Sequence, residues 1–172
     1  MELQLLHGFA AVPEFPENAP TFAENAVGKA LYYSKYSEDR VFADDSGLVV
    51  PALGGAPGVL SARYAGPGAS SEARNTKLLG ELHGKQGAER AAYFVCVIAL
   101  ALHGRCLMVV SGKVEGAILQ EACGAGGFGY DPVFYFPQLG KSFAELTAEE
   151  KNEHSHRGKA FRRLMEILEQ KN

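Results

Sequence analysis

Two adjacent carboxylates, Asp44 and Asp45, lie in the stretch "ADDSG", directly after an apolar segment and ending at Gly47. The surrounding residues, "RVFADDSGLVV", predict a strand with an acidic break in its middle, and α/β proteins place their sites where strand ends meet loops. Successive strand residues point to opposite faces, so the two carboxylates need not share a role. An Asp/Ser/Gly turn, in which side chains bond nearby backbone N–H groups, explains the same stretch equally well.

A third carboxylate, Glu24, stands near the start of a predicted helix, "TFAENAVGKALYYSKYSED". Thr21 and Glu24 match the capping-box pattern, which gives Glu24 a structural explanation at the positive end of the helix. If Glu24 also faced Asp45, their oxygens would suit Mg²⁺, which favours oxygen ligands and keeps several waters. Zinc is not predicted, because "HSH" at His154 to His156 lacks the partner ligands of a tetrahedral site.

The stretch "GAGGFGYDP" satisfies G-x-G-x-x-G at Gly124, Gly126 and Gly129, the dinucleotide-binding fingerprint. That fingerprint needs a helix directly after it, whereas here "YDPVFYF" predicts a strand, so the NAD reading fails. The glycines instead let the backbone approach a ligand or turn tightly beneath Phe128. Phe128 could stack on a flat ring, although a lone Phe is by default a core residue.

The stretch "EEKNEHSHRGK" gathers Lys151, His156, Arg157 and Lys159 around the start of the last predicted helix. One interpretation is a solvated helix end with mixed charges, as most charge runs are. The other uses the free N–H groups of the helix start, together with Lys and Arg, to hold an acidic or carbonyl-rich ligand.

The elements that must position these groups mix helices and strands without an internal repeat. "MELQLLHGF" could be a short strand, and residues Ser71 to Leu82 predict a second helix. "RAAYFVCVIALAL" and "CLMVVSGKVEGAIL" predict a β-hairpin that turns near Gly104. After the aromatic strand "VFYF", a capping box at Thr147 and Glu150 opens a short helix, and a final helix follows Ser155. We therefore predict one α/β domain over residues 1–172, with a mixed sheet.

Composition narrows the class of protein. The chain has 172 residues, of which 47% are hydrophobic and 22% charged, values typical of a folded domain. Its net charge of −3 argues against a protein that coats nucleic acid. Its three cysteines form no C-x-x-C pair and suit a reducing cytosol. The sequence shows no signal peptide, and its longest apolar run is too short to span a bilayer, so we expect a cytoplasmic protein without a membrane partner.

Four stretches, taken in order, resemble the inosine triphosphate pyrophosphatases, which hydrolyse deaminated purine nucleoside triphosphates. They are "TFAENAVGKA", "ADDSGLVVPALGGAPGVLSARYAG", "GGFGYDPVF" and "FAELTAEEKNEHSHRGKA", and the resemblance covers Thr21 to Leu168. It implies an elongated α/β fold with a mixed sheet flanked by helices, two lobes and a central cleft, assembled as a homodimer. It also implies Mg²⁺-dependent hydrolysis of ITP, dITP and XTP to the monophosphate and pyrophosphate.

The resemblance assigns roles to individual residues. Asp45 would be the general base and a Mg²⁺ ligand, and Glu24 would help to hold the ion. The others would bind substrate: Ser46 and Lys29 near the phosphates, Phe128, Gly129, Tyr130 and Asp131 around the base, and Lys151, His156 and Arg157 closing over base and sugar. Inosine and xanthosine carry an acceptor oxygen where adenine carries an amine, so donors at that point would reject adenine.

The start of the chain departs from the family pattern. Family members begin with a strand, a Gly/Asn loop with a Lys that grips the triphosphate, and a helix, whereas "MELQLLHGF" resembles the second strand. We therefore expect an N-terminally shortened chain that lacks part of the triphosphate grip. The alternative function is a shortened, catalytically weak or inactive nucleotide-binding homologue.

Overall fold

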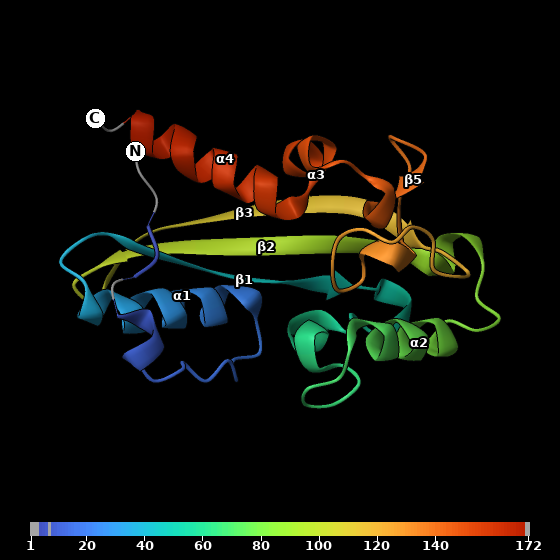
Figure 1. Cartoon of the computed structure of the whole chain (residues 1–172), viewed down its shortest axis with the longest axis horizontal. Helices are drawn as coiled ribbons and strands as arrows, with labels where there is room; N and C mark the ends of the chain where they lie inside the picture. The colour runs from blue at the N-terminus through green and yellow to red at the C-terminus, as the bar shows by residue number, and fades with distance from the viewer. Residues whose placement is uncertain (1–3, 7, 171–172) are drawn as a thin grey trace.

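The computed structural model describes residues 4–6 and 8–170 and shows a long five-stranded sheet with helices on both sides (Figure 1). The strands follow one another across the sheet in chain order: β1 (Val41–Val49), β2 (Ala91–Leu102), β3 (Arg105–Ile118), β4 (Phe134–Phe136) and β5 (Lys141–Ser142). The helices are α1 (Phe22–Tyr33), α2 (Ser71–Glu81), α3 (Ala148–His154) and α4 (His156–Glu169). In Figure 1, α1 and α2 lie on one side of the sheet and α3 and α4 on the other.

The predicted hairpin is confirmed. Strands β2 and β3 are joined through His103 and Gly104, which both have positive φ, the conformation that a two-residue hairpin turn requires. Each pairing between described strands is antiparallel, which differs from the mixed sheet that we expected. The physical reason is that each connection starts the next strand at the end of the sheet where the previous strand finished. The last residue of β1, Val49, therefore pairs with Tyr93 near the start of β2, and Val41 pairs with Ala101.

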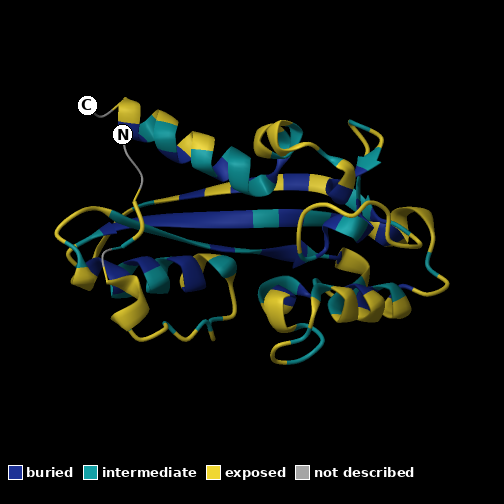
Figure 2. Ribbon diagram, viewed as in Figure 1, coloured by how far each residue is buried: buried dark blue, intermediate teal, exposed yellow. Residues whose placement is uncertain are grey.

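Strand β2, which lies between β1 and β3, is buried on both faces, which explains its long apolar run (Figure 2). One face packs against α4, through Cys96, Ile98 and Leu100 on the strand and Ala160, Leu164 and Leu168 on the helix. The other face packs against α1, through Val97, Ala99 and Ala101 on the strand and Ala26 and Ala30 on the helix. Alternate residues of this one strand therefore pack against two helices, α4 on one face of the sheet and α1 on the other.

A third apolar cluster fills the other end of the sheet. Leu78 and Leu82, in and just after α2, meet the aromatic residues Phe94, Phe134 and Phe143. The Phe94 and Phe134 ring centroids are 4.6 Å apart, and those of Phe134 and Phe143 are 4.9 Å apart in an edge-to-face arrangement. This cluster fixes the end of the sheet on which the glycine-rich loop sits.

The two predicted capping boxes differ in how completely they form. The capping box at Thr147 and Glu150 is confirmed, whereas only half of the box at Thr21 forms, because Glu24 accepts from the Thr21 hydroxyl instead of its backbone N–H. In the "MELQLLHGF" segment, residues 1–3 and 7 lie outside the described residues, and the others form no strand.

Within the part of the chain that the structure describes, none of the helices has the length and apolar character needed to cross a bilayer.

Candidate active site

The side chains of Asp44 and Asp45 point to opposite faces of strand β1. The strand runs unbroken through "ADDSG", so the turn interpretation of this stretch is wrong. Asp45 points toward α1, where its Oδ2 accepts a hydrogen bond of 2.9 Å from Nδ2 of Asn25. Asp44 points the other way, and its Oδ2 accepts hydrogen bonds from Nη2 of Arg157 in α4 at 2.9 Å and from the Ser46 hydroxyl at 2.8 Å. The pleat of one strand therefore gives the two carboxylates different partners.

Asn25 fixes the orientation of the Asp45 carboxylate. Its own amide is held in place because its Oδ1 accepts the backbone N–H of Ala19 at 3.0 Å. With the oxygen assigned in this way, the NH₂ group points to Asp45, and the Asn25 side chain is almost completely buried. The second oxygen of Asp45, Oδ1, accepts the backbone N–H of Ser46 at 3.0 Å.

The Asp45 carboxylate lies in an environment that favours its neutral form. Burial raises the pKa of Asp45 above its usual value, and the hydrogen bond from Asn25 and the positive charge of Lys29 only partly oppose this effect. The nearby negative charge of Glu17 raises the pKa further. Lys29 itself forms an ion pair with Glu17, with 2.8 Å between Nζ and Oε1. A cation placed beside Asp45 would offset this loss of solvation.

Asp45 and Glu24 carry carboxylate oxygens, the type of ligand that Mg²⁺ prefers. Glu24 lies in the first turn of α1, and its Oε2 accepts the Thr21 hydroxyl at 2.6 Å. Among the described residues, no group of three or more His, Cys, Asp and Glu side chains is arranged to hold a metal ion. Two carboxylates would leave the remaining positions around a Mg²⁺ ion to phosphate oxygens and water.

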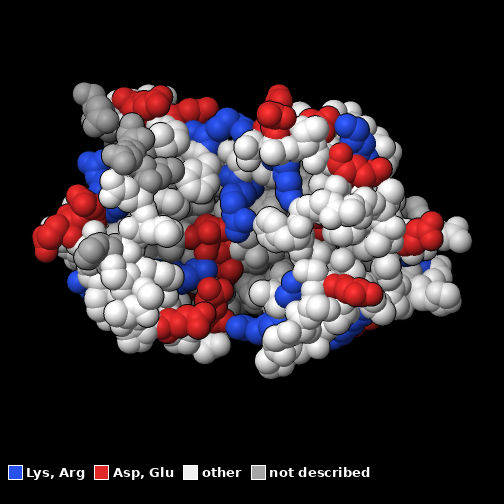
Figure 3. Space-filling view, viewed as in Figure 1, with Lys and Arg blue, Asp and Glu red and all other residues white. Residues whose placement is uncertain are grey.

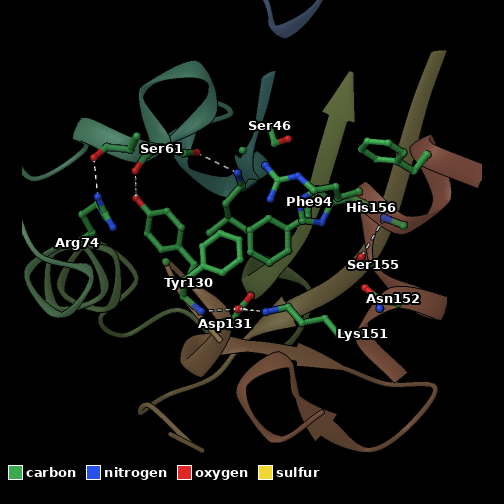
Figure 4. A pocket seen from close by; sticks show the side chains of 18 residues that line it. Ser46, Ser61, Arg74, Phe94, Tyr130, Asp131, Lys151, Asn152, Ser155 and His156 are labelled. Atoms are coloured by element: carbon green, nitrogen blue, oxygen red, sulfur yellow. Dashed lines mark hydrogen bonds and ion pairs between the residues drawn. The ribbon is translucent and has the colours of Figure 1, made fainter. Parts of the chain in front are cut away.

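On the opposite face of β1 lies a cavity of about 700 Å³. Its walls are β1, the 3-10 helix Gly58–Arg63, the glycine-rich loop at residues 124–131 and the start of α4 (Figure 4). Most residues expected to bind substrate line it: Ser46, Phe128, Gly129, Tyr130, Asp131, Lys151, His156 and Arg157. Asp45, Glu24 and Lys29 do not line it. The cavity and the Asp45 carboxylate meet at Ser46, which lines the one and bonds the other through its backbone.

The Phe128 ring forms an exposed platform at the mouth of the cavity. It is 65% exposed, so it is not the core residue that a lone Phe would be by default. The side chain of Asp131 accepts the Phe128 backbone N–H at 2.8 Å and forms an ion pair with Lys151. Gly127 has φ +74°, and a Cβ at that position would be 2.2 Å from Asp131 Oδ2. The glycine therefore allows the backbone to wrap closely around the Asp131 carboxylate.

Two cationic side chains accompany this platform. Lys151 Nζ lies 4.8 Å from the centre of the Phe128 ring, and the Arg157 guanidinium carbon lies 5.9 Å from it. Burial alone would raise the pKa of Asp44, but the charge and hydrogen bonds of Arg157, together with the Ser46 hydrogen bond and the charge of Lys29, hold that pKa below its usual value. In the view of Figure 3, Lys and Arg side chains (blue) and Asp and Glu side chains (red) lie along the middle of the molecular surface.

His156 forms part of the cavity wall at the start of α4. Its ring stacks on Phe94, with centroids 4.8 Å apart and planes 13° apart, and Nδ1 is buried without a hydrogen-bond partner among the described residues. Burial lowers the pKa of His156 to about 3, and the neighbouring positive charge of Arg157 contributes to this shift. The imidazole is therefore neutral near pH 7, and Arg157 and Lys151 supply the positive charge.

This shift makes stability depend on pH. The unfolded chain takes up a proton on His156 as the pH falls through about 6.5, whereas the folded chain resists until about pH 3, so stability is lost over that interval. His156→Phe keeps the stack on Phe94 and removes the titration. Between pH 7.5 and 5.0 the wild type should lose about 2 kcal/mol more unfolding free energy than the variant in urea titrations. Equal losses in the two proteins would contradict a buried neutral His156.

Sequence patterns did not reveal several residues of the site. Asn25 follows Glu24 directly, but nothing in the spacing indicated that its amide would reach Asp45. Asn75, in α2, donates from Nδ2 to the carbonyl of Gly129 at 3.1 Å, and Ser61 accepts the Tyr130 hydroxyl at its carbonyl at 2.9 Å. The one signal for Asn75 is that a polar residue occupies the apolar face of a predicted helix, one turn before Leu78.

The comparisons with known proteins agree with one another. A sequence profile described as the Ham1 family matches residues 1–167. The chain is 51% identical over 171 residues to the dITP/XTP pyrophosphatase of Geobacillus kaustophilus, which covers 99% of this chain and 83% of that protein. The structure of the Staphylococcus aureus Ham1 protein matches with a TM-score of 0.89 at 42% identity, over 95% of this chain and 84% of that one. A HAM1 protein from Coxiella burnetii matches with a TM-score of 0.87 at 43% identity, covering 93% and 82% of the two chains.

Proposed function

The chain belongs to the Ham1 family, and we propose that it hydrolyses the deaminated purine nucleoside triphosphates dITP, ITP and XTP to monophosphate and pyrophosphate. Support comes first from the curated relatives, which carry the name dITP/XTP pyrophosphatase at about half-identical sequence. The observation that contributes most is the cavity, where the exposed Phe128 ring and two cationic side chains lie together. A flat base with an acceptor oxygen at position 6 can stack on the ring and accept hydrogen bonds from the cations.

The same geometry suggests how adenine is rejected. Lys151 and Arg157 are donors only, and the acceptor oxygen at purine position 6 of inosine and xanthosine complements them. Adenine presents an amine there, so a donor would face a donor and both would lose their bonds to water. Asp131, which accepts from Lys151 and from the Phe128 backbone, keeps the Lys151 ammonium at the platform.

In the proposed reaction the Asp45 carboxylate takes a proton from the attacking water. The water oxygen bonds to the α-phosphorus, the bond to the bridging oxygen breaks, and pyrophosphate leaves. Asn25 holds the carboxylate in one orientation, and its hydrogen bond favours the ionised form that a base requires. Lys29, whose charge reaches both Asp44 and Asp45, is suited to attract the phosphates.

We further propose that Asp45 and Glu24 bind Mg²⁺ together with the substrate. The support is the all-oxygen donor set and the buried, incompletely compensated charge of Asp45. When bound, the ion would neutralise negative charge on the phosphate oxygens.

The test is pyrophosphate release with Mg²⁺ from dITP, ITP, XTP and ATP. We expect kcat/KM for dITP to exceed that for ATP by at least about 100-fold, and EDTA to stop turnover. Equal rates on dITP and ATP would contradict the recognition of a deaminated base. Binding of inosine monophosphate without turnover of any triphosphate would instead favour the weak or inactive homologue.

The proposal also includes a homodimer in the cytoplasm. Strand β3 presents Leu107 and Val109, which are 45% and 46% exposed, beside an outer edge that pairs with β4 only at Ala117 and Ile118. These apolar side chains would be covered by a second copy of the chain. Sedimentation velocity should give the mass of two chains, and a mass of one chain at all concentrations would contradict the dimer.

A further inference from the structure

The exposed Phe128 platform owes its orientation to the backbone around it. Because the ring is 65% exposed, core packing does not hold it in place. The flanking residues Gly127 and Gly129 both have positive φ, a region open to glycine without strain, but glycine also leaves the chain free to adopt other conformations. Something other than side-chain packing must therefore keep this loop in one conformation.

Hydrogen bonds from two sides supply that constraint. On the α3 side, Asp131 holds the Phe128 backbone N–H and the Lys151 ammonium. On the α2 side, the Asn75 amide donates to the Gly129 carbonyl at 3.1 Å, although 54 positions separate the two residues in the chain. The peptide group that joins Phe128 to Gly129 therefore lies between two fixed points.

Asn75 is an unusual residue for its position. It is 7% exposed, its Oδ1 is buried without a hydrogen-bond partner among the described residues, and it shares the buried face of α2 with Leu78. An unpaired buried oxygen destabilises the folded state, and an apolar residue would avoid that cost. The amide is explained if its Nδ2 contact with the loop matters more than the packing of the helix.

We propose that Asn75 is a positioning residue for base recognition, which holds the Gly129 carbonyl and so fixes the tilt of the Phe128 ring in the cavity. This inference rests on the proposed function only in taking the cavity as the purine site. Asn75 itself does not line the cavity, so its effect on substrate passes through the loop. Without this tether the Gly129 peptide can rotate, and the ring samples orientations that do not match the base.

The experiment combines Asn75→Leu with a double-mutant cycle. Leucine has a similar shape and lacks both the donor and the unpaired oxygen, so the fold should be retained, as circular dichroism and thermal melting can check. Calorimetric titration with inosine monophosphate should show about 5- to 10-fold weaker binding for the variant than for the wild type. In a Phe128→Ala background, Asn75→Leu should cause no further loss. Asn75→Asp, which keeps the shape but offers no donor, should weaken binding at least as much.

A ligand-free measurement separates this inference from the proposed function. Hydrogen exchange by mass spectrometry should show faster exchange over residues 127–131 in Asn75→Leu, with the exchange of α4 unchanged. Unchanged exchange in the loop, unchanged affinity, or losses that add to those of Phe128→Ala would each overturn the positioning role. If the wild type itself binds no inosine monophosphate, the purine assignment fails, whereas faster loop exchange would still support the tether between Asn75 and Gly129.

Discussion

Asp45→Asn is expected to lower kcat for dITP hydrolysis by at least about 1000-fold, because an amide cannot accept the proton of the attacking water. The variant should keep the wild-type fold. Burial already raises the pKa of Asp45, which means that the folded protein disfavours its charge, and the neutral amide has the same shape. Its oxygen can still accept the hydrogen bond from Asn25, but its NH₂ group then takes the place of the oxygen that accepts the Ser46 backbone N–H, which should cost about 1 to 2 kcal/mol of stability. Steady-state pyrophosphate release and urea unfolding measure the two effects.

The neighbouring carboxylate provides the matched control. Asp44→Asn changes the same chemical group one residue earlier in β1, but its partners are Arg157 and Ser46 on the cavity side. This variant should raise KM by releasing Arg157 and should keep kcat within about 10-fold of the wild type. If both variants lost turnover to the same extent, the assignment of the base to Asp45 alone would be wrong.

Asp131→Ala is expected to reduce the free energy of unfolding by about 3 kcal/mol and to abolish measurable binding of inosine monophosphate. The Asp131 side chain is buried, and its removal leaves both the Lys151 ammonium and the Phe128 backbone N–H without their acceptor. The loss should appear in urea titrations as a lower midpoint with an unchanged slope, since the rest of the fold is retained.

An exposed ion pair gives the comparison for this prediction. Glu89→Ala removes one partner of the Lys85–Glu89 pair, in which the Glu89 side chain is 58% exposed. Such pairs contribute less than about 1 kcal/mol, so this variant should unfold almost as the wild type does. A similar, small loss in both variants would show that Asp131 is not the organising charge of the platform.

Local patterns in the sequence predicted the elements whose causes are themselves local. The apolar run of β2, the turn at Gly104 and the capping box at Thr147 depend on neighbours within a few residues, and each was found as expected. The strand through "ADDSG" was harder to predict, because Asp, Ser and Gly are residues typical of turns. The long ladder to β2, in which Asp45 pairs with Val97, keeps it extended.

Contacts between distant residues could not be predicted from the sequence alone. The ion pair between Asp44 and Arg157 spans 113 positions, and the bond from Asn75 to Gly129 spans 54. No periodicity encodes such pairs, since they arise only when helices from opposite sides of the sheet meet one strand and one loop. The resemblance to the inosine triphosphate pyrophosphatases assigned the residues that would touch substrate, but it did not indicate the amides that orient them.

The alternation of Asp44 and Asp45 along β1 has a consequence for how this molecule can change. Under the proposed function, the groups that would recognise the base lie on one face of this strand and the carboxylate that would act as general base lies on the other, with Ser46 in contact with both. Substitutions around Phe128 would then alter which base is accepted without replacing any residue that contacts the Asp45 carboxylate. Conversely, a one-residue insertion in this strand would invert the two sides and disable both tasks together.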